Sequence, residues 1–224
     1  MKIREQLKEM FQIQRVLNEN ILDEFGEEAM TEEKLELAII DELGELTHEL
    51  KGDWCWWKKT QKPVDRKRVL EELVDVYHFV MINEMERRCS STDEAIDSIL
   101  NKYKFSISHF NELGKERLDC LISDISSTCD KLGYLLHLTE CLKFSFDEIY
   151  QEYLNKSKIN YERLKNGYWL WNQKKHWNKR VSLNFMRVRM WLVLHQWETD
   201  LNSMKILKRF VFVTNIMKLV SVLI

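Results

Sequence analysis

Apolar residues in the first part of the chain recur at intervals of three and four, which places them on one face of an α-helix. The first such run extends from Ile3 to Phe25 and ends at Gly26, a residue type that commonly terminates helices. Thr31 then offers an N-cap for a second helix, which we expect to continue to a break at residues 51–53. The pattern therefore predicts two long helices near the N-terminus.

Capping residues predict further helices along the chain. Asp65 can cap a third helix, because an aspartate side chain accepts hydrogen bonds from the first backbone amides. Ser91 with Glu94, and Ser145 with Glu148, match the capping box, in which each side chain binds the amide of the other residue. These two pairs predict helix starts near residues 92 and 146.

The composition fits an all-α protein. Of the 224 residues, 45% are apolar and 31% are charged, and one proline and six glycines provide too few tight turns for many strands. We expect six or seven helices before Gly167. The longest apolar run, residues 210–224, is shorter than the ~20 residues that span a bilayer, so no transmembrane helix is predicted.

The five cysteines show no spacing typical of a metal site. Their odd number, together with the lack of a secretory leader, favours free thiols in a reducing compartment. We therefore expect an intracellular, cytoplasmic protein.

Two pairs of acidic residues suggest a metal site. Glu42 and Glu45 lie three residues apart in the second predicted helix. Glu72 and Asp75 repeat this spacing in the third, so each pair shares one helix face. Their apolar neighbours predict half-buried carboxylates, which would repel one another unless a cation compensated their charge. Oxygen ligands without His or Cys favour Mg²⁺ or Mn²⁺.

The alternative interpretation is that these acids form solvated helix faces balanced by Lys51, Arg66 and Arg68. One acidic pair alone would favour that alternative, but its repetition in consecutive helices favours a metal site. Gly44 adds to this, because a glycine inside a helix costs roughly 1 kcal/mol relative to alanine. We therefore expect something to approach the backbone at Gly44.

The sequence around these acids resembles a known family. The segments DELGEL, DWCWWK and EELVDVYHF are similar to the dimeric all-α dUTP diphosphatases of the all-α nucleoside triphosphate pyrophosphatase superfamily. The resemblance extends from about Gln14 to Tyr168. It implies a helical bundle of that superfamily's type, a catalytic domain over residues 1–168 and a homodimer. The implied activity is hydrolysis of dUTP to dUMP and pyrophosphate by a Mg²⁺-activated water, which limits uracil incorporation into DNA.

The resemblance also implies roles for single residues. The implied metal ligands are Glu42, Glu45, Glu72 and Asp75, of which Glu42 or Glu45 would orient or deprotonate the attacking water. The implied phosphate-binding residues are Lys156, Asn160, Arg163 and Tyr168. The implied nucleoside-binding residues are Gln14, Asn18, Trp57, His78 and Phe79.

The residue types suit these roles. Lys156 and Arg163 share a helix face and offer cations to a triphosphate, although an exposed basic helix end is the simpler interpretation. The amides of Gln14 and Asn18 carry both donors and acceptors, as the uracil edge requires, but they could equally be polar residues on a wet face. Leu164 stands where the family usually has a glutamine.

Residues 169–224 depart from the resemblance. They contain ten Lys or Arg residues, two acidic residues and five of the eight tryptophans. We expect a packed or poorly ordered extension. The alternatives are a divergent or frame-altered end, and a basic amphipathic helix that contacts a membrane surface or nucleic acid. Two alternatives to dUTP hydrolysis also stay open: a pyrophosphatase for dCTP or another nucleotide, and a helical interaction protein without catalytic activity.

Overall fold

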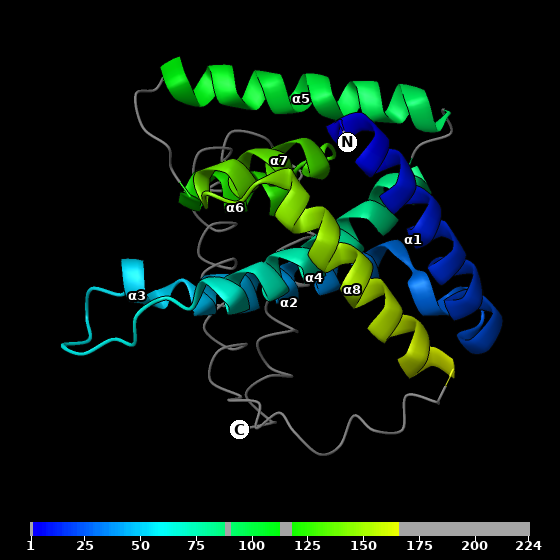
Figure 1. Ribbon diagram of the computed structural model, residues 1–224, viewed down its shortest axis with the longest axis horizontal. Coiled ribbons are helices and arrows are strands. Elements are labelled where there is room, and N and C mark those ends of the chain that lie inside the picture. The colour runs from blue at the N-terminus through cyan, green and yellow to red at the C-terminus, as the bar shows by residue number, and fades with distance from the viewer. Residues whose placement is uncertain (1, 88–90, 113–117, 166–224) are drawn as a thin grey trace, which may run out of the picture. The chain divides into compact units, whose positions relative to one another are not determined.

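The computed structural model describes residues 2–87, 91–112 and 118–165, and these residues form helices without any strand (Figure 1). The elements are α1 (Ile3–Phe25), the 3₁₀ helix η1 (Glu27–Met30), α2 (Glu32–Glu49), α3 (Lys51–Trp54), α4 (Arg66–Arg87), α5 (Thr92–Glu112), α6 (Leu118–Ser127), α7 (Lys131–Cys141) and α8 (Phe146–Lys165). The predicted all-α fold class is confirmed.

Side-chain caps begin the helices where the sequence predicted them. Ser91 N donates to Glu94 Oε2 over 3.1 Å and Glu94 N donates to Ser91 Oγ over 3.4 Å, so the capping box starts α5. Ser145 and Glu148 form the same reciprocal pair at the start of α8, at 2.8 and 3.3 Å. Thr31 Oγ1 accepts a hydrogen bond from the first turn of α2 at 3.4 Å. Local sequence therefore fixes where these helices begin.

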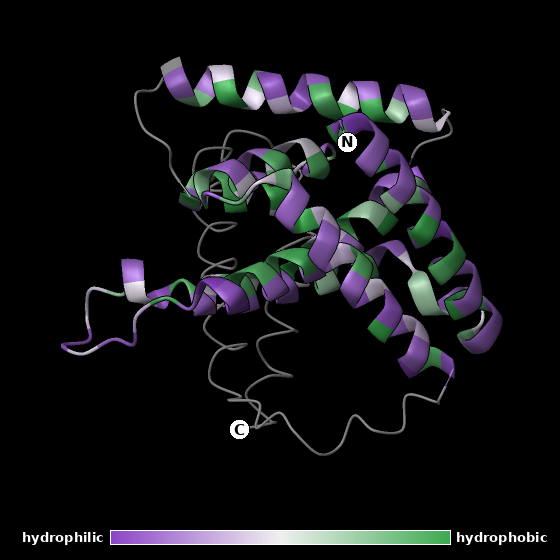
Figure 2. Ribbon diagram, viewed as in Figure 1, coloured by the Kyte–Doolittle hydropathy of each residue, from purple (hydrophilic) through white to green (hydrophobic). Residues whose placement is uncertain are grey.

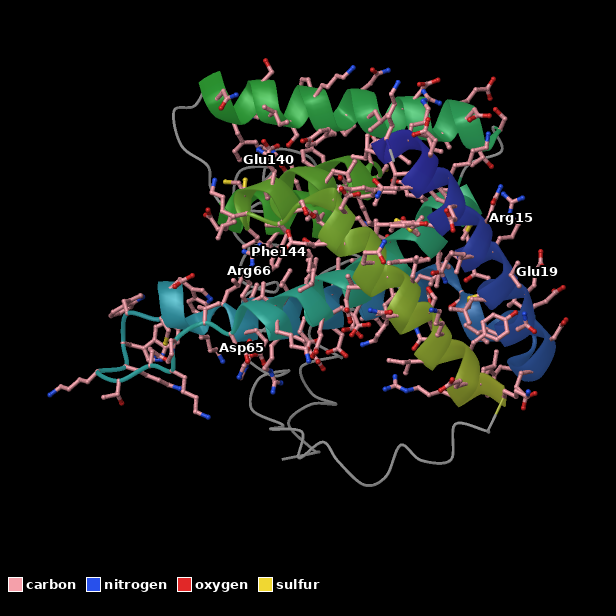
Figure 3. The ribbon with its side chains drawn as sticks, viewed as in Figure 1. Arg15, Glu19, Asp65, Arg66, Glu140 and Phe144 are labelled. Atoms are coloured by element: carbon pink, nitrogen blue, oxygen red, sulfur yellow. The ribbon has the colours of Figure 1, made fainter. Side chains whose placement is uncertain are left out.

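The start of α4 is held by two adjacent residues, both labelled in Figure 3. Asp65 Oδ1 accepts a hydrogen bond from Lys67 N over 3.0 Å, as predicted for a cap. The guanidinium of Arg66 lies 3.9 Å from the centroid of the Phe144 ring, and Arg66 donates to the backbone oxygen of Lys143 over 2.6 Å. These contacts tie the start of α4 to the turn between α7 and α8.

The segment after α2 differs from the prediction. Helix α2 ends at Glu49, close to the expected break, but Lys51–Trp54 then form one further helical turn, α3. A Cβ added to Gly52 in this turn would lie 2.8 Å from the backbone oxygen of Lys62, so only glycine lets the returning loop pass. The described residues contain eight α-helices, and the predicted six or seven was too low. A single turn is too short to show helical periodicity.

Helix α4 is the centre of the described fold, because it packs against α1, α2, α7 and α8. Figure 2 shows apolar and polar residues along α1, α4 and α8, the mixture that lets one side of a helix enter the core. Buried apolar residues in contact across these helices include Leu7, Met10, Ile39, Leu43, Leu46, Leu73, Val74, Tyr77 and Val80. The acidic pairs of α2 and α4 are interleaved with these residues, which places both pairs beside the core.

Among the residues that the structure describes, no helix combines the length and hydrophobicity needed to cross a membrane. The predicted domain boundary at residue 168 and the predictions for residues 169–224 concern residues outside the described part of the chain. They stay predictions.

Candidate active site

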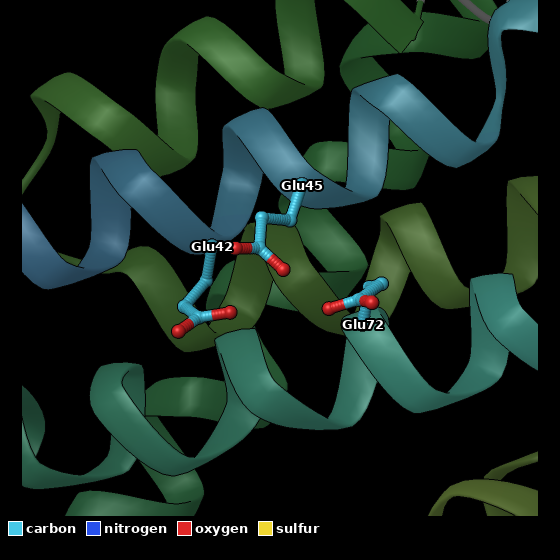
Figure 4. Close-up of side chains that lie close together, drawn as sticks. All are labelled: Glu42, Glu45 and Glu72. Carbon is cyan, nitrogen blue, oxygen red and sulfur yellow. The ribbon is translucent and has the colours of Figure 1, made fainter. Parts of the chain in front are cut away.

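Helices α2 and α4 bring their acidic side chains together. The two helices lie side by side and run in opposite directions (Figure 1). Figure 4 shows the carboxylates of Glu42 and Glu45, from α2, and of Glu72, from α4, directed into the space between the helices. One oxygen from each of these three groups lies within 4.8 Å of the others. That spacing allows a single divalent cation to contact all three.

Asp75 joins this group electrostatically. Burial raises the pKa of Glu42 from 4.5 to about 8, and the negative charge of Asp75 is the next largest cause. Glu45 and Glu72 raise the same pKa further, and Asp41 adds the smallest contribution. The charges of all three other predicted ligands therefore act on Glu42. We refer to Glu42, Glu45, Glu72 and Asp75 as the carboxylate cluster.

Lys156 from α8 forms an ion pair with one member of this cluster. Its Nζ lies 2.6 Å from Asp75 Oδ2, and each of the two side chains is only 19% exposed. Such a short, half-buried, charge-assisted contact is stronger than a typical surface ion pair. The predicted phosphate-binding lysine thus pairs with a predicted metal ligand.

The cations that could have balanced the cluster as a solvated surface bind elsewhere. Arg66 Nη2 lies 3.2 Å from Glu148, and Arg68 Nε lies 3.2 Å from Glu49. Lys51 Nζ lies 2.9 Å from the ring of His48. These contacts weaken the interpretation of the four acids as an ordinary exposed surface.

Gly44 does not behave as predicted. A Cβ added at this position would meet no described atom within 4 Å, so the helix has open space there instead of a close neighbour. Gly44 is two residues from Glu42, which corresponds to about 200° around the helix axis. It therefore lies on the outer side of α2, away from the carboxylate cluster.

A second group of polar residues lies buried between α1, α4 and α8. Tyr153 OH donates to Gln14 Oε1 over 2.5 Å, and His78 Nδ1 lies 2.7 Å from the same oxygen. Gln14 Nε2 donates to Asn18 Oδ1 over 2.8 Å. The His78 ring stacks on the Tyr153 ring with centroids 4.2 Å apart. We refer to Gln14, Asn18, His78 and Tyr153 as the neutral network.

The two groups are joined by helices α4 and α8. Asp75 and His78 are three residues apart on α4, and Lys156 and Tyr153 are three residues apart on α8. Asp75 therefore meets Lys156 while His78 meets Tyr153, one helical turn away. Sequence reasoning missed Tyr153. Its only signal was this spacing from Lys156, which matches the spacing of His78 from Asp75.

The remaining predicted residues are less closely grouped. Trp57 is 55% exposed, and its ring contacts Trp54 and Trp56, with centroids 5.5 and 5.8 Å away. Phe79 is half-buried and packs against the core. Asn160 and Arg163 follow Lys156 along α8, half-buried and exposed respectively. Tyr168 lies outside the described residues.

A family model described as dUTPase matches residues 6–168, which include the carboxylate cluster, the neutral network and every other predicted site residue. The chain belongs to the dUTPase family. Its activity is that of a dUTP diphosphatase, a hydrolase of nucleoside triphosphates that releases pyrophosphate. No curated protein matches the chain. The match confirms the predicted enzyme class. It covers the three sequence segments on which the resemblance was based.

Proposed function

We propose that the carboxylate cluster of this dUTP diphosphatase holds Mg²⁺ and that the neutral network binds the nucleoside of dUTP. The observation that carries the metal assignment is the set of three carboxylate oxygens within 4.8 Å of one another, contributed by two helices. Burial and the negative charges of the neighbouring carboxylates raise the pKa of Glu42, and a divalent cation would offset both effects. Hard oxygen ligands without nitrogen or sulfur suit Mg²⁺, with Mn²⁺ as a substitute.

The protein's own residues then have separate tasks. When bound, Mg²⁺ supplies Lewis acidity that favours ionisation of water and neutralises phosphate charge. Glu42 and Glu45 are the candidates to orient the attacking water and accept its proton. Water oxygen forms a bond to phosphorus, the anhydride bond to the leaving pyrophosphate breaks, and the departing oxygens remain anionic. Lys156, with Asn160, Arg163 and Tyr168, is assigned to the phosphates.

The metal assignment is tested by neutralising single members of the cluster. Glu45→Gln and Asp75→Asn each keep the side-chain shape and remove one charge, so we expect Mg²⁺-dependent release of pyrophosphate from dUTP to fall by more than about 100-fold. Glu71→Gln is the matched control, because Glu71 is also on α4 but pairs with Lys67 at 3.7 Å. Full activity of either cluster variant, with the control also active, would contradict the assignment.

The nucleoside assignment is tested with a panel of nucleotides. Donors and acceptors in the neutral network can distinguish uracil from cytosine, whose hydrogen-bonding edges are reversed at two positions. We therefore expect kcat/KM for dUTP to exceed that for dCTP. Equal values would contradict the assignment of Gln14 and Asn18 to the base.

We propose a homodimer inside the cell as the working form. Exposed apolar side chains support it: Leu37 on the outer side of α2 is 62% exposed and Trp56 is 87% exposed. A twofold partner would cover such surfaces. Leu37→Glu should shift the molar mass measured by light scattering from dimer to monomer. Phe105→Glu, a similarly exposed position on α5, tests whether the partner covers that helix instead.

A further inference from the structure

The members of the neutral network are buried and hold one another in place. Gln14, His78 and Tyr153 are each less than 5% exposed, and they come from three different helices. Two donors converge on one amide oxygen, at 2.5 Å from the Tyr153 hydroxyl and 2.7 Å from His78 Nδ1. A buried network in which each member constrains the next fixes the orientation of every group in it.

We propose that Tyr153 is a positioning residue, whose hydroxyl fixes the amide of Gln14 so that His78 presents an unprotonated Nε2 to a hydrogen-bond donor of the bound nucleoside. The inference rests on the proposed nucleoside site and deepens it. It assigns a task to a tyrosine that lies 139 residues from Gln14 in the sequence. It also assigns a chemical class, a hydrogen-bond donor, to the ligand group that meets His78.

One atom of the Gln14 amide faces both Tyr153 and His78. It is the oxygen Oε1, which lies 2.5 Å from the Tyr153 hydroxyl and 2.7 Å from His78 Nδ1. Its two lone pairs accept from the Tyr153 hydroxyl and from His78 Nδ1. The amide nitrogen points the other way, toward Asn18 at 2.8 Å.

This arrangement determines the tautomer of His78. An amide oxygen can only accept, so Nδ1 must carry the hydrogen that bridges to Gln14. Burial, followed by the nearby positive charge of Lys156, lowers the pKa of His78 to about 3, and the ring is neutral at physiological pH. A neutral imidazole has one N–H, which leaves Nε2 as an acceptor.

Nε2 of His78 is buried and has no hydrogen-bond partner among the described residues. An unsatisfied buried acceptor costs roughly 1–3 kcal/mol of stability. We therefore expect the bound ligand to supply the hydrogen-bond donor that Nε2 lacks. The contact with Gln14 and the stack on Tyr153 together hold the ring in this orientation. A deoxyuridine nucleotide offers two donors, the N3–H of uracil and the 3′-hydroxyl of deoxyribose.

The role of Tyr153 is tested by removing its hydroxyl. We expect Tyr153→Phe to raise KM for dUTP about tenfold with kcat changed less than about threefold, because ground-state binding is lost while the carboxylate cluster is intact. ¹⁵N NMR of the imidazole should show the Nδ1–H tautomer in the wild type and a mixture of tautomers in the variant. Tyr150→Phe is the matched control, because the Tyr150 hydroxyl on the same helix bonds to Glu9 instead.

A purely structural role for Tyr153 would lower thermal stability without changing the tautomer or KM, and that result would overturn the proposal. So would an Nε2–H tautomer in the wild type. Neither outcome affects Mg²⁺-dependent release of pyrophosphate by the wild type, which tests the proposed function separately.

The source of the donor is found with two analogues. N3-methyl-dUTP lacks the imide hydrogen, and 2′,3′-dideoxyuridine triphosphate lacks the 3′-hydroxyl. We expect one of them to bind the wild type at least fivefold more weakly than dUTP, with the difference abolished in His78→Phe, which keeps the stacked ring. If His78→Phe leaves both differences unchanged, Nε2 does not meet the nucleoside and the proposal fails.

Discussion

The carboxylate cluster and the neutral network are adjacent on α4 and α8 but hold together in opposite ways. In the cluster, burial and the negative charges of neighbouring carboxylates together raise the pKa of Glu42 to about 8. In the network, every identified contact is a hydrogen bond between uncharged groups or a ring stack. In a cation site, the bound cation relieves the repulsion between the acidic residues. A nucleoside site instead needs its donors and acceptors to be fixed before the ligand binds.

The largest expected effect concerns the raised pKa of Glu42. The folded-state pKa of Glu42 is about 8 and the ordinary value is 4.5, so between these pH values the folded protein keeps a proton that the unfolded chain releases. Stability of the metal-free protein therefore falls as pH rises through this window, by up to roughly 1.4 kcal/mol per pH unit. Glu42→Gln should lack this contribution and be the more stable protein at pH 8, measured by urea unfolding in EDTA.

Glu49→Gln provides the control for that measurement. Glu49 is on the same helix and pairs with Arg68 at 3.2 Å, so its variant should keep the wild-type dependence on pH. Parallel stability curves for wild type and Glu42→Gln would show that the pKa of Glu42 is not raised in the folded protein, and the comparison between the two groups would fail.

The two groups also differ in how far the sequence predicts them. Glu42 with Glu45, and Glu72 with Asp75, are local pairs, and helix geometry alone places each pair on one face. The neutral network depends on contacts between α1, α4 and α8, and no local pattern relates Tyr153 to Gln14. Sequence could therefore predict the cluster as a unit, but it could predict Gln14, Asn18 and His78 only through the family resemblance.

The fold likewise combines features that local sequence predicts with features that depend on long-range contacts. Capping pairs such as Ser145 with Glu148 are local, and they predicted the start of α8 to within a residue. The one-turn helix α3 was not predicted, because it depends on the later chain passing Gly52 at close range. The pairing of Lys156 with Asp75 was missed for the same reason, since it joins residues 81 positions apart.

The contribution of the neutral network to stability should depend on pH in the opposite direction to that of Glu42. Burial and the charge of Lys156 lower the pKa of His78 from 6.5 to about 3, so on acidification the unfolded chain takes up a proton before the folded protein does. Stability should fall as pH falls below 6.5, by roughly 2 kcal/mol at pH 5. His78→Phe removes this contribution, and urea unfolding between pH 7 and pH 5 measures the difference. An unchanged acid slope in the variant would contradict the neutral, buried state of His78.

Lys156 connects the two groups and should compete with the metal. Its Nζ contacts Asp75 at 2.6 Å, so it competes with a bound cation for the negative charge of that carboxylate. We expect Lys156→Met to bind Mg²⁺ about tenfold more tightly without nucleotide, a change of ~1.4 kcal/mol. The same variant should have a higher KM for dUTP. Calorimetry gives the Mg²⁺ affinity, and Lys158→Met, on the exposed side of α8, is the control. Weaker Mg²⁺ binding by Lys156→Met would mean that the lysine supports the cluster instead.

Gly44 lies on the outer side of α2, and its replacement has the smallest expected effect on stability and activity. No described atom lies within 4 Å of an added Cβ, so Gly44→Ala should gain the usual advantage of alanine inside a helix, roughly 0.5–1 kcal/mol. The methyl group would point away from Glu42, and kcat for dUTP should therefore stay at the wild-type value. Urea unfolding and a steady-state assay test both parts. A stabilised variant with reduced kcat would show that the outer side of α2 takes part in catalysis, because the carboxylates themselves are unchanged.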